Sequence, residues 1–74
     1  MQTTFSGASR AITVNGQSLE SGADTLEALL EELSLKGVSL VAEVDGNIIK
    51  PDEFALTPIR GGECIELVRF VGGG

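Results

Sequence analysis

The 74-residue sequence has no histidine, a single cysteine and only five lysines and arginines. Without histidine, it cannot build a Cys/His metal site or the Ser/His/Asp and Cys/His nucleophile systems of hydrolases. One cysteine excludes an internal disulfide framework and suits a reducing compartment. These absences disfavour hydrolytic catalysis and turn attention to binding and carrier functions.

The shortage of basic residues leaves a formal net charge of −6 and a pI near 4.3. Nucleic acid and anionic membrane are poor partners for such a chain, because phosphate contacts need clustered Lys and Arg. No apolar run reaches the roughly 18 residues of a membrane span. Residues 1–7 lack the basic and apolar regions of a signal peptide. We therefore expect a cytoplasmic protein that binds neither nucleic acid nor membrane.

Other common ligand sites are also missing. Gly61 and Gly62 lack the strand–loop–helix setting and the lysine of a phosphate-binding loop, and no calcium-loop spacing occurs. Cys64 has no neighbouring base in the sequence, so we interpret it as a small buried or half-buried side chain. The sequence predicts no metal site, no bound cofactor and no catalytic residue of its own.

The hydrophobic content of 42% and a regular apolar pattern predict one folded domain near the lower size limit for a self-sufficient core. Residues 1–10 show no clear period and predict a flexible N-terminal extension. The folded domain is expected over residues 11–71, followed by a flexible glycine tail at 72–74.

Two turn signals predict two β-hairpins. Residues 11–14 alternate apolar and polar and precede Asn15-Gly16, the strongest two-residue hairpin signal, because a type I′ turn needs positive φ at both positions. Residues 17–21 then form the returning strand. A second turn, Asp45-Gly46, joins a strand over 38–44 to a short one over 47–50, which Pro51 ends because it offers no N–H.

Between the hairpins, leucines recur at i, i+3, i+4 and i+7 and predict an amphipathic helix: Leu26, Leu29, Leu30 and Leu33. We expect a capping box in which Asp24 accepts a backbone N–H and Glu27 reaches back. Lys36 lies near the expected C-terminal end, and Gly37 is the expected C′ residue. The leucine face is interpreted as core rather than a partner surface. The glutamates beside it are interpreted as a solvated face rather than catalytic carboxylates.

The remaining segments complete the sheet. Residues 51–59 lack strand alternation and predict a short helical turn or ordered loop that tucks Phe54 and Leu56 under the sheet. The last strand, 64–71, places Ile65 and Leu67 on the core face. Val68 and Phe70 fall on the other face and suggest a partner-docking patch, although isolated exposed hydrophobes are ordinary.

The expected element order is β-β-α-β-β-β, an α+β fold in which a mixed sheet packs on one main helix. This is the ubiquitin-like β-grasp arrangement if the first and last strands lie side by side, in the centre and parallel. The strand order is an analogy; the pattern itself predicts only the elements.

The chain finishes with Gly72, Gly73 and Gly74. Glycine has no Cβ, so such a tail can enter a narrow channel and extends roughly 10 Å from the last strand. It could therefore deliver the terminal carboxylate of Gly74 to another protein's active site, where activation as a mixed anhydride with AMP would make it an acyl donor. The alternative is an inert linker, since glycine-rich ends are often only that.

Residues 11–74 resemble the sulfur carrier proteins of thiamin biosynthesis, the ThiS family. The resemblance rests on the order of several short motifs: Val14-Asn15-Gly16, the leucine helix from Thr25, Val44-Asp45-Gly46, Ile49-Lys50-Pro51, Gly62-Glu63, Ile65-Glu66-Leu67-Val68 and Phe70-Val71-Gly72-Gly73-Gly74. The last of these is the most specific. The ten residues before the first strand are a departure from the family, and their role stays open.

The resemblance implies a co-substrate rather than an enzyme. An E1-like adenylating enzyme would use ATP and magnesium to adenylate Gly74, and a cysteine desulfurase relay would convert it to a thiocarboxylate. Thiazole synthase would then take the sulfur. Four alternatives remain: the small subunit of molybdopterin synthase, a carrier for cysteine or another sulfur product, a protein modifier, and a plain interaction domain.

Overall fold

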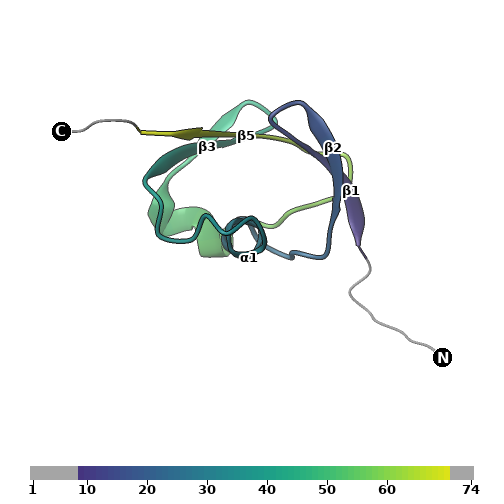
Figure 1. Cartoon of the computed structure of the whole chain (residues 1–74), viewed down its shortest axis with the longest axis horizontal. Helices are drawn as coiled ribbons and strands as arrows, with labels where there is room; N and C mark the ends of the chain where they lie inside the picture. Colours follow the sequence, from purple (N-terminus) through teal and green to yellow (C-terminus); the bar gives the residue numbers. More distant parts are fainter. Residues whose placement is uncertain (1–8, 71–74) are drawn as a thin grey trace.

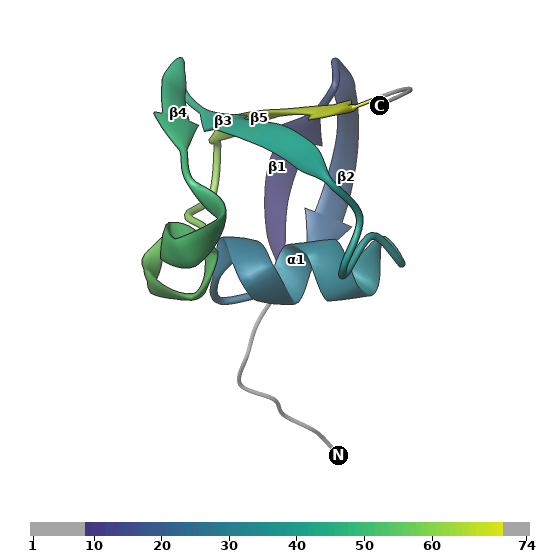
Figure 2. The same cartoon turned by 90° about the vertical axis from the view of Figure 1, so that its left-hand side faces the viewer.

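The computed structural model describes residues 9–70, in which one five-stranded sheet arches over a single α-helix (Figures 1 and 2). The elements in chain order are β1 (Arg10–Val14), β2 (Gln17–Ser21), α1 (Leu26–Glu32), β3 (Leu40–Val44), β4 (Asn47–Ile49), the 3-10 helix η1 (Pro51–Leu56) and β5 (Cys64–Arg69). The strand order is β2-β1-β5-β3-β4. The predicted β-grasp fold is confirmed.

The centre of the sheet is the parallel pair of β1 and β5, the first and last strands. Thr13 aligns with Cys64, and the Thr13 N–H donates to the Glu63 carbonyl over 3.0 Å. On its other side β5 runs antiparallel to β3 from Ile65 to Arg69. Each hairpin therefore supplies one neighbour of β5. The central, parallel pairing of the first and last strands is the arrangement that the analogy predicted.

Both tight turns form as the Asx-Gly signals predicted. Asn15 and Gly16 have φ of 50° and 83°, and Asp45 and Gly46 have 50° and 87°. Asparagine and aspartate tolerate this left-handed region better than other residues with a Cβ, and glycine adopts it freely. Four strand boundaries shift: β1 begins one residue before its predicted start, at Arg10, and β3 begins two residues after its own. β4 ends one residue early, at Ile49, and β5 ends at Arg69 rather than at residue 71.

The helix N-terminus differs from the predicted capping box. Thr25 is the N-cap, and its hydroxyl accepts the Ala28 N–H over 3.1 Å. Asp24 instead pairs with Arg10 on β1, with 3.1 Å between Oδ1 and Nη2. The prediction that Asp24 and Glu27 form the box is therefore wrong, because Asp24 is engaged by a residue distant in the sequence.

The helix also ends before the predicted Gly37. Ser34 takes the left-handed conformation, with φ of 61°, and donates to the Glu31 carbonyl over 3.0 Å. The Leu35 N–H donates to the Leu30 carbonyl over 2.7 Å, which completes a Schellman motif. Gly37 belongs to the following turn rather than to the helix cap. The loop from Leu33 to Leu35 consequently runs past one end of the sheet.

The core lies between the sheet and α1, and it includes three of the four predicted helix leucines as buried residues, with Leu33 half-buried. Phe54 packs against this core, as predicted. Leu56 does not, because 79% of it is exposed. A 3-10 helix has about three residues per turn, so two residues two positions apart cannot share a face. The prediction that both lie under the sheet is wrong for Leu56.

Candidate functional site

The residues predicted to carry the chemistry, Gly72, Gly73 and Gly74, lie outside the described residues, as do Val71 and residues 1–8. The predictions of a flexible tail, a flexible N-terminal extension and a reactive Gly74 therefore stay predictions. What the structure does describe is the strand that leads to the glycines. That strand is β5, and Phe70 is the residue after its end.

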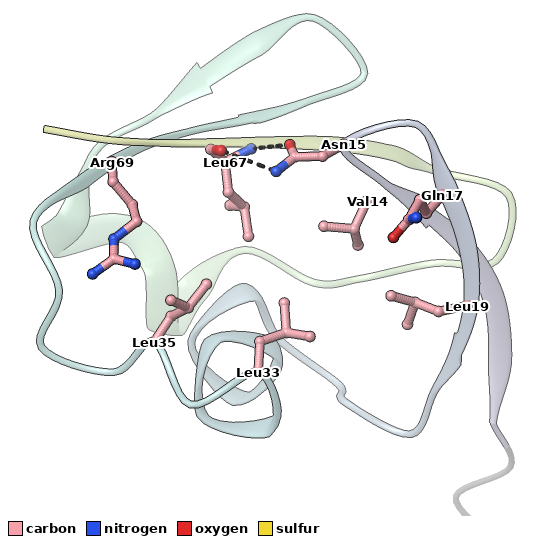
Figure 3. A pocket seen from close by; sticks show the side chains of 8 residues that line it. All are labelled: Val14, Asn15, Gln17, Leu19, Leu33, Leu35, Leu67 and Arg69. Atoms are coloured by element: carbon pink, nitrogen blue, oxygen red, sulfur yellow. Dashed lines mark hydrogen bonds between the residues drawn. The ribbon is translucent and has the colours of Figure 1, made fainter.

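β5 is held by the first residue of each hairpin turn. The Asn15 side chain brackets Leu67: its Nδ2 donates to the Leu67 carbonyl over 3.1 Å, and its Oδ1 accepts the Leu67 N–H over 2.8 Å (Figure 3). From the opposite hairpin, Asp45 Oδ1 accepts the Cys64 N–H over 2.8 Å. The Asp45 N–H in turn donates to the Cys64 carbonyl over 2.8 Å.

These bonds extend the pairing of β5 beyond its backbone ladders. The Phe70 N–H also donates to the Ser39 carbonyl over 3.1 Å, so β5 stays attached up to the last described residue. The sequence analysis assigned Asn15 and Asp45 only to their turns. The only signal for the second role was that both are Asx residues, whose side chains carry acceptors, and in asparagine also donors, for backbone groups.

The outward face of β5 carries the predicted docking residues. Val68 and Phe70 are 60% and 65% exposed, so their exposure is confirmed, while their role in docking stays a prediction. Phe70, just past the end of β5, also lines a second groove together with Leu40 and Phe54. Val68 lies opposite Val41 on β3. In the neighbouring outward-facing row, Glu66 lies opposite Glu43. This face therefore combines apolar and acidic side chains. The pairing of Glu66 with Glu43 also costs stability, because two like charges directly opposite one another destabilise a sheet.

A groove of about 330 Å³ lies on the inner side of the sheet, between the β1–β2 hairpin and the loop after α1 (Figure 3). Its lining residues come from both of these segments and from β5: Val14, Asn15, Gln17, Leu19, Leu33, Leu35, Leu67 and Arg69. Figure 3 shows the apolar side chains pointing toward one another across this space and Arg69 at one side. The sequence analysis did not predict this groove.

The ionisable side chains form no metal-ligand cluster in the part of the chain from Ser9 to Phe70. No three of its Cys, Asp and Glu side chains come together as metal ligands. Cys64 is exposed, so the prediction of a buried or half-buried thiol is wrong. The reason is strand alternation, which places Cys64 on the same face of β5 as the exposed Glu66 and Val68. The Lys36 ammonium donates to Glu31 over 3.0 Å, and this bond raises the pKa of Lys36 above its usual value.

Comparison with known proteins adds three findings. A model of the ThiS family matches residues 4–74. The crystal structure of a thiamine biosynthesis protein (ThiS) from Geobacter metallireducens superposes with a TM-score of 0.73 at 28% sequence identity, covering 86% of this chain and 99% of that one. A search of curated proteins found no significant match.

In residues 9–70 there is no helix of the length and apolarity needed to cross a membrane.

Proposed function

The chain belongs to the ThiS family, the sulfur carriers of thiamin biosynthesis, and we propose that its working group is the carboxylate of Gly74. The observation that carries this proposal is the extent of the family match, which continues through the glycines to residue 74. The described structure is compatible with this role, because its central strand β5 leads directly toward that end.

In the proposed cycle, an E1-like adenylating enzyme uses ATP and magnesium, and the Gly74 carboxylate displaces pyrophosphate to give an acyl-adenylate. A protein persulfide of the cysteine desulfurase relay then displaces AMP and forms an acyl disulfide with Gly74. A second thiol of the relay attacks that S–S bond, which releases the thiocarboxylate and leaves a disulfide on the relay protein. Thiazole synthase takes this sulfur for the thiazole ring. The carrier contributes no catalytic side chain, binds no cofactor and is not an enzyme. We expect all of these steps in the cytoplasm, without nucleic acid or membrane.

The glycine tail and strand β5 have different roles in this proposal, and the small size of glycine explains the role of the tail. An ionised carboxylate is a poor acyl donor, so the activating enzyme must enclose it and keep water from the adenylate. Gly72 and Gly73 bring no side chain into that enclosure and accept backbone angles that other residues avoid. β5, held by two hairpins, gives this tail a fixed origin at Phe70.

We further propose that Val68 and Phe70 dock against the partner enzymes. Among residues 9–70 they are the exposed large apolar side chains nearest in sequence to the tail. Burying them against a partner removes apolar surface from water. The nearby Glu43 and Glu66 would favour a partner whose contacting surface combines apolar side chains with Lys or Arg, because complementary charge selects and orients partners.

The test is mass spectrometry of the carrier after incubation with its cognate adenylating enzyme, ATP, magnesium and a sulfur source. We expect the C-terminal peptide to gain the mass difference between sulfur and oxygen. Deleting Gly74 should abolish adenylation and leave thermal unfolding nearly unchanged. A protein modifier would instead become linked to larger proteins, and an inert domain would keep its mass. Sulfur transfer to a molybdopterin precursor rather than a thiazole would identify the rival family.

A further inference from the structure

The groove between the β1–β2 hairpin and the loop after α1 is open because the helix stops early. The Schellman motif at Ser34 ends α1 at Glu32, and the chain then leaves along Leu33 and Leu35 instead of continuing as a helix. Both leucines are only half-buried. Together with Leu19 and the inward-facing Leu67, they line a concave apolar surface that no described segment of this chain covers.

One cation lies at the side of this groove. Arg69, at the end of β5, is exposed, and among residues 9–70 the only ion pairs are those of Arg10 and Lys36. Arg69 therefore has no carboxylate partner in that part of the chain, although the chain carries a net charge of −6. Asn15 also lines the groove, but its amide is already bonded to the Leu67 backbone. Among the residues that line the groove, the guanidinium of Arg69 is therefore the charged group that can select an anionic ligand.

The groove is bordered by an edge strand. β2 pairs only with β1, so its second edge is unpaired within the described sheet. Gln17 and Leu19 of β2 line the groove. An extended peptide can add backbone hydrogen bonds to such an edge while its side chains enter the neighbouring pocket.

We propose that this groove binds an extended loop of the adenylating enzyme, in which a large apolar side chain is closely followed by Asp or Glu. The apolar residue fills the space between Leu33, Leu35 and Leu67, and the carboxylate pairs with Arg69. This inference rests on the proposed function. The activating enzyme is the fitting occupant, because Arg69 lines the groove and immediately precedes Phe70, the last described residue before the tail that this enzyme would enclose.

The decisive measurement is the Kd of the full-length carrier for its cognate adenylating enzyme, by calorimetry without ATP. Arg69→Glu reverses the charge at the groove, and Arg60→Glu makes the same change at an exposed arginine that does not line it. We expect Arg69→Glu to raise Kd about tenfold or more, and Arg60→Glu to change it by less than about threefold. Gln17→Trp, which fills the groove without removing an apolar contact, should also raise Kd at an unchanged melting temperature.

Several results would overturn the proposal. If both groove variants bind like the wild type, or if the arginine reversals weaken binding equally, the enzyme does not use the groove. Dimerisation of the isolated carrier that Gln17→Trp abolishes would assign the groove to a second copy. Tight binding of octanoate, lost in Arg69→Glu, would assign it to a small amphipathic acid. Failure of the proposed function is distinguishable, because then even the wild-type carrier stimulates no ATP-dependent release of pyrophosphate by the enzyme.

Discussion

The two faces of β5 differ although their residues alternate along one short strand. Ile65 is fully buried and Leu67 is 8% exposed, whereas Val68 and Phe70 are 60% and 65% exposed. The inward side chains pack on the helix and hold the sheet to it. More than half of the surface of Val68 and of Phe70 is in contact with water. Stability and partner recognition can therefore be changed separately, by substituting neighbouring residues of the same strand.

The largest effect should come from the inward face. Ile65→Ala removes a side chain with no exposed surface from the centre of the core, so we expect a loss of about 2–5 kcal/mol in the free energy of unfolding. Urea denaturation followed by circular dichroism measures it. In so small a domain this loss could unfold the protein, and Ile65→Val, which should cost about 0.5–1.5 kcal/mol, is the milder companion. A loss below that range for Ile65→Ala would contradict the assignment of this face to the core.

A smaller loss should follow from releasing β5 at the hairpin. Asn15→Ala removes both bonds to Leu67 and puts a less suitable residue at φ of 50°, so we expect a cost of about 1–3 kcal/mol. Hydrogen exchange should show the Leu67 amide losing protection more than the Ile12 amide does. Unchanged exchange at Leu67 would mean that the backbone ladders alone hold the strand. Asn15→Asp is the companion variant: it keeps the acceptor for the Leu67 N–H, but replaces the donor by a carboxylate oxygen and adds a negative charge.

On the outward face, stability and binding should move in opposite directions. Glu66→Lys replaces a like-charge pair with an opposite-charge pair across from Glu43, so we expect a gain of about 0.2–1 kcal/mol in stability. The same change should weaken binding to the adenylating enzyme, because it removes an acidic group beside the proposed docking patch. Thermal unfolding and calorimetric titration test the two halves. A variant that binds as well as the wild type would remove the acidic pair from the interface.

The smallest effect on stability should come from Phe70→Ala, within about 0.5 kcal/mol of the wild type, because most of the side chain is already in water. Its Kd for the adenylating enzyme should nevertheless rise clearly. Leu56→Ala is the matched control, since Leu56 is a similarly exposed apolar residue on η1. A loss of several kcal/mol for Phe70→Ala would place Phe70 in the core instead and erase the contrast between the two faces.

The parts of the fold that the sequence predicted are those set by local pattern. The spacing of the leucines fixed the buried face of α1, and the two Asx-Gly pairs fixed the hairpins and, through them, the alternation of β5. The errors arose where a contact distant in the sequence or an unusual backbone decided the outcome. Asp24 and Thr25 are both good N-caps, and the pairing of Asp24 with Arg10 on β1 is a contact that the local sequence does not reveal. Ser34 adopts the left-handed conformation that glycine usually occupies at a helix end, so the sequence did not indicate that the helix ends there.

The candidate site divides in the same way. Outward exposure of Val68 and Phe70 followed from strand alternation. The bracket between Asn15 and Leu67 joins residues far apart in the chain, and the groove exists only because α1 ends at Glu32. Neither could be obtained from the sequence without knowing the pairing of β1 with β5 and the end of the helix.

The most direct test of the account is the mass of the C-terminal peptide after the full-length carrier has been incubated with its adenylating enzyme, ATP, magnesium and the sulfur relay. The account predicts that Gly74 exchanges one oxygen for sulfur and that omitting ATP prevents the exchange. A C-terminal peptide of unchanged mass, in a reaction where the enzyme thiolates a control carrier, would contradict it.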